Sequence, residues 1–295
     1  MKKHSVPLPR KIFVVFNYLF FILITLFCIY PIWFIFISSV SGSSGASGIL
    51  LPKNFTLMNY EKVMQIPGIA RAFGISVART VVGTFLTVLA SMFLGYIFTK
   101  EQMPFHKFLY RMLIITMYVS GGLIPTYLVI RAYGLLNNFW VYILPGMISA
   151  YYVILIKTFV EQLPASVEES AMLDGAGVLT VFFRIILPMS MPIVATIAVF
   201  AGVGQWNSYF DNAIYTFQNK NLTTLQYMLY TFLNEAEVII RQLSETSADI
   251  DISKLLTPKG IRMTVTMVTV TPVLFIYPFL QRYFIKGIMI GAVKG

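Results

Sequence analysis

The feature that most constrains this chain is a long apolar run close to its N-terminus. Residues 12–38 contain no charged side chain. A helix needs about 20 apolar residues to cross the hydrocarbon core of a bilayer, where only helices and closed barrels satisfy every backbone polar group. Because the run is continuous instead of alternating between polar and apolar positions, it favours a helix over a barrel strand. The sequence therefore predicts a membrane protein built from helices.

Five further apolar runs have the same character as the first. Spans are predicted at residues 80–99, 112–130, 139–156, 189–210 and 263–281. Composition agrees, since 57% of the residues are hydrophobic and only 12% are charged, about half the charged fraction of a typical soluble domain. The predicted fold class is an all-α membrane protein with six transmembrane helices.

The distribution of charge predicts the orientation of these spans. Lys2, Lys3, Arg10 and Lys11 precede the first span, and basic residues concentrate on the cytoplasmic side of membrane proteins. Both termini are therefore predicted to be cytoplasmic, together with the loops 99–111 and 157–188. The segments 39–79, 131–138 and 211–262 are predicted outside, and the last of these is rich in acidic residues. The first apolar run is too long for a signal peptide.

Several classes of function are disfavoured by the sequence. The net charge of +10 does not indicate nucleic-acid binding, because the positive residues are scattered at the ends of apolar runs. One cysteine, Cys28, and two distant histidines do not predict a metal site. The sequence has no phosphate-binding Gly-x4-Gly-Lys-Ser/Thr loop, paired intramembrane carboxylates or Gly-x-Ser-x-Gly elbow. We therefore predict neither ATP hydrolysis nor other catalysis by this chain.

The cytoplasmic segment 161–188 differs from its apolar surroundings. Pro164 suits the first turn of a helix. Glu168 and Glu169 fall in the early turns of that helix, where carboxylates interact favourably with the helix dipole. On these grounds the segment begins with a well-capped helix at the inner face of the membrane.

Two glycines are expected to end this helix. Gly175 and Gly177 are placed there because glycine adopts backbone angles that other residues avoid. Asp174 is expected to cap a second short helix, over 178–186, or to bond across the turn. Pro188 then precedes the fifth span. The result is a helical hairpin, and residue chemistry alone leaves open whether it is a plain amphipathic loop or a docking surface.

The spacing within this hairpin resembles a known motif. Glu169-Ser170-Ala171 is followed after three residues by Gly175, and after nine more by Ile185-Ile186-Leu187-Pro188. This resembles the Glu-Ala-Ala loop of importer-type ABC transporter permeases, and the form that includes Asp174 and Ala176 resembles the sugar-importing branch. Ser170 departs from the alanine that is frequent there, but serine is also small.

The resemblance extends along most of the chain, from about residue 12 to 295. Residues 55–64 and 121–146 resemble segments of carbohydrate permeases. Residues 222–233 and 277–295 are similar to the branch of lipo-oligosaccharide and uronate-oligosaccharide permeases. The resemblance implies a six-helix type I ABC importer permease of the MetI/MalG-like fold, with an N-terminal tail 1–11, a permease domain 12–285 and a C-terminal tail 286–295.

In such permeases the hairpin fits a cleft on an ATPase subunit and transmits its motion. The resemblance implies that Glu169 pairs with a basic group on the ATPase and that Gly175 allows close contact. The full set of implied coupling residues is Glu168, Glu169, Ala171, Asp174, Gly175, Ala176, Ile185, Leu187 and Pro188.

The resemblance also implies partners. They are a second, homologous permease that completes a heterodimer, two copies of an ABC ATPase that bind ATP and magnesium, an extracytoplasmic solute-binding protein, an oligosaccharide and membrane lipids. The chain itself needs no cofactor, and the expected location is a bacterial cell membrane. The alternative function is an ion- or proton-coupled sugar carrier, which usually requires ionisable groups at mid-membrane that the predicted spans lack.

The predicted substrate pathway rests on polar and aromatic residues within spans. Trp206 and Tyr209 offer faces for sugar rings, and Asn207 and Ser208 offer hydrogen bonds to hydroxyl groups. Helix packing and interfacial anchoring are the competing interpretations. Further candidates are Ser120, Gly121 and Gly122, which either open a helix or allow close packing, and the tyrosines Tyr151 and Tyr152.

Two external features complete the sequence predictions. Arg79 and Asp211 are the charges nearest the outer boundary, and each is expected to lie at a lipid headgroup more readily than to pair. Within the external segment 213–260, a helix over 222–243 is predicted to present Leu225, Met228, Leu229 and Phe232 on one face. The polar residues 244–260 are expected to contact the solute-binding protein or to form a lid on the bundle.

Overall fold

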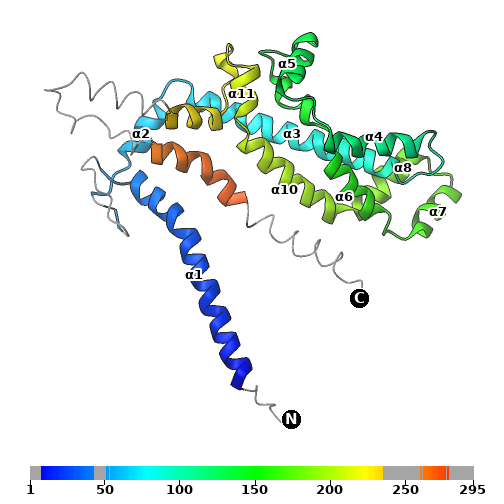
Figure 1. Ribbon diagram of the computed structural model, residues 1–295, viewed down its shortest axis with the longest axis horizontal. Helices are drawn as coiled ribbons and strands as arrows, with labels where there is room; N and C mark the ends of the chain where they lie inside the picture. Colours follow the sequence, from blue (N-terminus) through cyan, green and yellow to red (C-terminus); the bar gives the residue numbers. More distant parts are fainter. Residues whose placement is uncertain are drawn as a thin grey trace. The chain divides into compact units, whose positions relative to one another are not determined.

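The computed structural model describes residues 8–42, 51–52, 54–234, 260, 262–276 and 278 (Figure 1). Regular structure in these residues is helical, apart from one isolated bridge between Ser41 and Phe55. The predicted all-α class is therefore confirmed. The elements in chain order are α1 (Leu8–Ser39), α2 (Met58–Met64), α3 (Ile69–Ile97), α4 (His106–Tyr118), α5 (Leu123–Ala132), η1 (Phe139–Tyr142), η2 (Leu144–Gly146), α6 (Ala150–Val160), α7 (Ala165–Leu173), α8 (Val178–Val181), η3 (Phe182–Ile186), α9 (Leu187–Met189), α10 (Met191–Asn207), α11 (Phe210–Tyr215) and η4 (Lys220–Leu222). Helices also cover residues 225–234 and 262–276.

The helices agree with the predicted spans in position but differ in length and continuity. Among the described residues, α1 and α3 are each long and apolar enough to cross a membrane, and two bent helix pairs raise that number to as many as four. The third predicted span is interrupted between α4 and α5. The sixth is helical over Arg262–Ile276, and residues 279–281 lie outside the described part. The count of six spans stays a prediction.

The described chain divides into two compact units. The first takes the described residues up to Ile66 together with those between 232 and 270. It contains α1, whose 32 residues rise about 48 Å at 1.5 Å per residue, more than a bilayer core of about 30 Å requires. The end of α1 is fixed by Asn59, whose Nδ2 donates hydrogen bonds to the carbonyl oxygens of Ser39 (2.9 Å) and Ser41 (3.0 Å).

The second unit takes Pro67–Thr231 with the described residues after 270. Its central helix is α3, which packs along α10 and α6 (Figure 1). The crossing with α6 is close because Gly95 has no side chain: a Cβ there would lie 2.5 Å from Cγ2 of Ile156. Small residues of this kind let membrane helices approach each other.

Two apolar clusters lie along α3 in this unit. One joins α3, α6, α10 and the α8–η3 helix, with Met92, Ile156, Val181, Phe182 and Ile197 in its centre. The other joins the N-terminal part of α3 to η1 and α11, and its buried members are Ile130, Val141, Tyr142, Ile143 and Tyr215. The first cluster supports the predicted cytoplasmic hairpin, and the second surrounds the ion pair described below.

Candidate coupling hairpin and transport cavities

The segment 161–188 folds as a helical hairpin, with α7 as its first arm and the continuous helices α8, η3 and α9 as its second. Gly175 sits in the turn with φ +84°. The Gly175 N–H donates to the Met172 carbonyl and the Ala176 N–H to the Ala171 carbonyl, both at 3.0 Å. This is the Schellman arrangement that ends helices at a left-handed glycine. The role predicted for Gly175 in ending the first arm is therefore confirmed.

The structure contradicts the role predicted for Gly177 and excludes one of the two alternatives for Asp174. Gly177 has φ −71° and ψ 160°, an extended conformation open to any residue, and it precedes α8 as its N-cap. Asp174 ends α7 and does not cap α8, because the Gly177 backbone takes that position without a side-chain cap. The turn needs only one left-handed residue, so a second glycine carries no special backbone role.

The second arm is set into the core at its base. Phe182 is fully buried and packs edge-on against Phe93, with ring centroids 5.5 Å apart. Ile186 is buried and Leu187 packs against the same cluster. The segment Phe182–Ile186 is a π-helix, in which the Leu187 N–H reaches the Phe182 carbonyl. Such a widened turn accommodates the ring of a following proline, here Pro188.

The two glutamates of the first arm have different environments. Glu168 forms an ion pair with Lys100, and its Oε1 accepts a hydrogen bond from the Tyr96 hydroxyl at 3.0 Å. The Lys100 ammonium also lies 4.4 Å from the centroid of the Tyr96 ring. Glu168 therefore joins the hairpin to the C-terminal end of α3. Glu169 is exposed, with no ion pair to it in the described part of the chain.

The tip of the hairpin exposes large apolar side chains. Leu173 is 88% exposed, Leu179 58% and Val178 52%. Ala171 and Ala176 are half-buried and pack on the core, so the tip itself is held in place. Exposed apolar patches on an ordered element commonly mark contacts with another protein or a membrane.

Arg79 and Asp211 form an ion pair inside the second unit, so the expectation that each lies at a headgroup is wrong. Arg79 belongs to α3, which begins at Ile69, well before the predicted span, and its side chain is only 3% exposed. Its Nε donates to Oε1 of Gln205 at 2.9 Å, and its Nη1 donates to the Ser208 carbonyl at 3.2 Å. The guanidinium lies 4.6 Å from the centroid of the Tyr142 ring.

Asp211 is positioned by its own element as well. Its Oδ1 accepts a hydrogen bond from Ser208 Oγ at 2.5 Å, and the carboxylate lies in the first turn of α11, where the helix dipole favours negative charge. Tyr215, at the end of α11, is also buried. Burial raises the pKa of its phenol, and the Asp211 carboxylate adds to the rise, so the hydroxyl stays protonated.

A polar cavity of about 390 Å³ adjoins this ion pair. It is lined by residues of α3, η1, η2, α6, α10 and α11, and its polar side chains are Thr87, Tyr142, Tyr152, Gln205, Asp211 and Tyr215. Of these, only Tyr152 was a sequence candidate. Gln205 belongs to the polar stretch 204–212 of the sequence, directly before Trp206, but the predicted pathway residues from that stretch were Trp206, Asn207, Ser208 and Tyr209.

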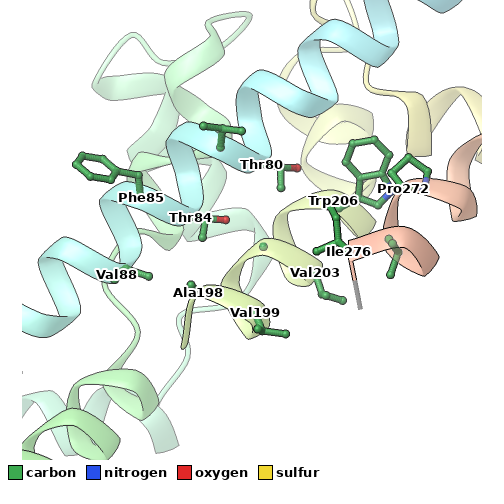
Figure 2. Close-up of a pocket in the computed structure, with 13 residues that line it drawn as sticks. Thr80, Thr84, Phe85, Val88, Ala198, Val199, Val203, Trp206, Pro272 and Ile276 are labelled. Atoms are coloured by element: carbon green, nitrogen blue, oxygen red, sulfur yellow. The ribbon is translucent and has the colours of Figure 1, made fainter. Parts of the chain in front are cut away.

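A second cavity of about 470 Å³ lies on the other side of α10 and is apolar. Figure 2 shows its walls, with Thr80 and Thr84 from α3, Val203 and Trp206 from α10, and Pro272 and Ile276 from the helix 262–276. Trp206 is 7% exposed and packs edge-on against Phe73. The Trp206 ring therefore lines the apolar cavity and packs against α3, and it does not line the polar cavity.

The other predicted pathway residues are dispersed. Ser208 supports the ion pair, and Tyr209 stacks on Tyr230 with centroids 4.6 Å apart. Asn207 ends α10 and is exposed, as is Tyr151 beside the cavity-lining Tyr152. The structure thus does not bring these residues together.

The third predicted span is not helical at Ser120, Gly121 and Gly122. These residues separate α4 from α5 and are exposed. Gly122 has φ 80° and ψ −179°, a backbone conformation essentially restricted to glycine. Its N–H is bonded to Ser120 Oγ at 3.3 Å.

No cluster of three or more histidine, cysteine, aspartate or glutamate side chains suited to a metal occurs in the described ranges. The predicted external helix is present over 225–234, where Leu225 and Leu229 are buried. The rest of that helix, from residue 235, the polar segment 244–259 and the tail 286–295 lie outside the described residues.

Comparison with known proteins shows which permeases this chain is similar to. No family model matches the chain. Two proteins of Bacillus subtilis are similar to it: LplC, 38% identical over 83% of this chain and 81% of its own length, and the polygalacturonan/rhamnogalacturonan transport system permease YtcP, 35% identical over 84% and 85%. The chain belongs to the carbohydrate-importer family of ABC transporter permeases. The arabinooligosaccharide permease AraQ of Halalkalibacterium halodurans is 25% identical to this permease over 83% of the chain.

A solved structure agrees on the fold of the permease. It is a bacterial ABC transporter involved in the import of the acidic polysaccharide alginate, one chain of which matches with a TM-score of 0.81 and 23% identity, over 95% of this chain and 99% of that chain. The MetI-like all-helical fold predicted from the sequence is therefore confirmed. As a transport permease the chain is not an enzyme, and ATP hydrolysis belongs to a separate ATPase subunit. The alternative of an ion-coupled carrier is set aside by this family membership.

Proposed function

We propose that the permease is one transmembrane subunit of an oligosaccharide importer and that its hairpin 161–188 receives the motion of the ATPase. The observation that carries the proposal is the contrast within the hairpin. The base is buried in the α3–α6–α10 core, whereas the tip exposes Leu173 and Glu169. A rigid element with an apolar, acidic tip is suited to a cleft on another protein.

The contacts of Glu168 indicate which helix a movement of the hairpin would displace. Its contacts with Lys100 and Tyr96 connect α7 to the end of α3. A displacement of the hairpin by the ATPase therefore reaches α3 directly, and α3 packs along α6 and α10. Of the two acidic residues, Glu169 is proposed to contact the ATPase and Glu168 to hold the hairpin to the bundle.

The proposed assembly follows the family. A second, homologous permease completes the pathway as a heterodimer, two ATPase copies bind ATP and magnesium, and an extracytoplasmic binding protein delivers the oligosaccharide. Both termini are proposed to lie in the cytoplasm, with the permease domain over 12–285, the external segment at 213–260 and the tails 1–11 and 286–295. The 80° bend between Val178–Met189 and Met191–Asn207 is proposed to mark the turn from the inner face into the membrane.

The substrate pathway is proposed to run along the polar face of α10. Gln205 and Asp211 line the polar cavity on this face, together with Tyr152 of α6. The exposed Asn207, the exposed Tyr151 and the interruption at Ser120, Gly121 and Gly122 remain candidates for the same path. Ser208 contributes by orienting Asp211.

Charge reversal at the tip tests the docking proposal. Glu169→Lys is expected to abolish co-purification of the ATPase with the permease, because the exposed carboxylate is proposed to meet a basic group. Glu101→Lys reverses an exposed charge in the loop 99–111, which is predicted to be cytoplasmic. It serves as the matched control and is expected to retain the ATPase. Retention of the full ATPase stoichiometry by Glu169→Lys would count against the docking assignment.

A further inference from the structure

The polar cavity has the composition of a small-molecule site. Its volume of about 390 Å³ falls within the range of about 300–1,000 Å³ seen for ligand pockets. Apolar wall is supplied by residues such as Val141 and Ala201, and a few polar groups converge on one side. Tyr152 contributes a ring and a hydroxyl group, and that hydroxyl makes no hydrogen bond within the described part of the chain.

Gln205 is held so that its amide N–H groups remain available. Its Oε1 accepts from Arg79 Nε at 2.9 Å, which fixes the plane of the amide. The close approach to α3 depends on Gly83, where a Cβ would lie 2.8 Å from Gln205 Cδ. Within the described residues Nε2 meets no acceptor, and Gln205 lines the cavity, so its amide N–H groups are free to donate to a ligand there.

Of the two members of the ion pair, only the acidic one lines the cavity. Asp211 lines it with a carboxylate, whereas its partner Arg79 does not line it. The Arg79 guanidinium is occupied by Gln205, the Ser208 carbonyl, Asp211 and the face of Tyr142. No lysine or arginine of the described chain lines the cavity. A ligand therefore meets hydrogen-bonding groups and one carboxylate but no available cation.

These groups favour the binding of a sugar that carries only hydroxyl groups and disfavour the binding of a sugar that carries a carboxylate. Hydroxyl groups donate to the Asp211 oxygens and accept from Gln205 Nε2. A ligand carboxylate would instead lie beside the Asp211 carboxylate, while Arg79 is already paired with Asp211 and does not line the cavity. Tyr152 adds an aromatic face of the kind that packs on sugar rings.

We propose that this cavity is a subsite for a neutral, hydroxyl-rich saccharide ring within this chain, and that it discriminates against uronic acid units. The proposal rests on the proposed function, since it names the class of substrate that the importer carries past α10. It also separates this permease from two similar proteins whose names state acidic polymers, polygalacturonan/rhamnogalacturonan and alginate.

The test measures direct binding by the permease without its solute-binding protein, so that the specificity of that protein does not enter. Saturation-transfer NMR is recorded on the purified permease–ATPase complex with three neutral trisaccharides (maltotriose, cellotriose and xylotriose) and with trigalacturonate. At least one neutral trisaccharide is expected to bind, and trigalacturonate is expected to bind at least about tenfold more weakly.

Two variants assign the binding to this cavity. Tyr152→Phe removes one hydroxyl, and Gln205→Glu keeps the acceptor for Arg79 while removing the two N–H donors. Each is expected to weaken binding of the neutral sugar by at least about fivefold, since Tyr152→Phe loses one hydrogen bond and Gln205→Glu loses one or two. Tyr133→Phe, at a residue that is 78% exposed and does not line the cavity, is the matched control and is expected to bind as wild type.

The outcomes are distinguishable from failure of the proposed function. Nucleotide-dependent ATPase activity and subunit stoichiometry of every complex are measured in parallel, so a complex that does not assemble contradicts the proposed function. An assembled, active wild type that binds none of the neutral sugars overturns the subsite proposal alone. So does equal binding of trigalacturonate, or neutral-sugar binding that both variants leave unchanged.

Discussion

Arg79 is held by groups from three neighbouring parts of the chain. It meets Gln205 of α10, the Asp211 carboxylate of α11 and the Tyr142 ring of η1. A buried ion pair contributes little net stability relative to apolar residues of the same size, but the removal of one partner leaves a desolvated charge. Arg79 and Asp211 are therefore best understood as a pair that fixes how α3, α10 and α11 meet beside the polar cavity.

A double-mutant cycle tests this pairing. Arg79→Met is expected to lower the free energy of unfolding by about 3 kcal/mol or more, whereas the double variant Arg79→Met/Asp211→Leu is expected to lose clearly less than the two single changes combined. The measurement is thermal or denaturant unfolding of the purified permease complex in detergent. Lys157→Met is the control: it removes an ion pair with the exposed Glu161 and a contact of the ammonium with the Tyr110 ring. It is expected to cost about 1 kcal/mol, clearly less than Arg79→Met. Strict additivity of the first two changes would contradict the pairing.

Arg79 also shows which feature of the fold could not be predicted from the sequence. The span predicted at 80–99 began directly after Arg79, because the charge itself was taken as the boundary. The helix instead begins at Ile69, and the cost of carrying the charge inward is offset by Asp211, 132 positions along the chain. Nothing in a single sequence shows that two charges so far apart meet, so their pairing and the cavity beside them emerge only from the folded chain.

At the scale of elements, the hairpin was the most predictable part of the molecule. Its signals are local: a proline before α7, carboxylates near its start and a glycine at its end. Local signals fix a turn because the backbone angles are decided within a few residues. They did not separate Gly175 from Gly177, and they did not show that Glu168 faces Lys100 while Glu169 faces outward, since both of those depend on packing against α3.

The two glycines of the hairpin provide a matched comparison. Gly175→Ala places a side chain at φ +84° and is expected to destabilise the turn by about 1 kcal/mol, because the left-handed region is unfavourable for residues with a Cβ. Gly177→Ala, at φ −71° and with nothing within 4 Å of the added Cβ, is expected to be close to neutral. Limited proteolysis of the hairpin in the purified complex compares the two. Equal rates of cleavage in the two variants would show that the left-handed turn does not govern the hairpin.

At the scale of the whole molecule, the sequence predicts the fold class and the family because both depend on long segments. Apolar runs of sufficient length dictate helices, and the motif spacing in 169–188 indicates the family that the relatives then show. The proposed pathway, which follows the polar cavity, was less predictable. Its polar groups come from α3, η1, α6, α10 and α11, and the polar residues 206–209 point to different neighbours once α10 is packed, with Trp206 in the apolar cavity and Tyr209 on Tyr230.

The central claim is that the tip of the hairpin contacts the ATPase, and cross-linking from that tip tests it most directly. In a Cys28→Ser background, which removes the only native cysteine, Leu173→Cys places a thiol at a side chain that is 88% exposed. With a short thiol-to-amine cross-linker in native membranes, it is expected to give one product containing the ATPase subunit, with a yield that changes when nucleotide binds. Tyr133→Cys, on the segment predicted outside, is expected to give none. Absence of the ATPase from the Leu173→Cys product, or an equal yield from Tyr133→Cys, would contradict the account.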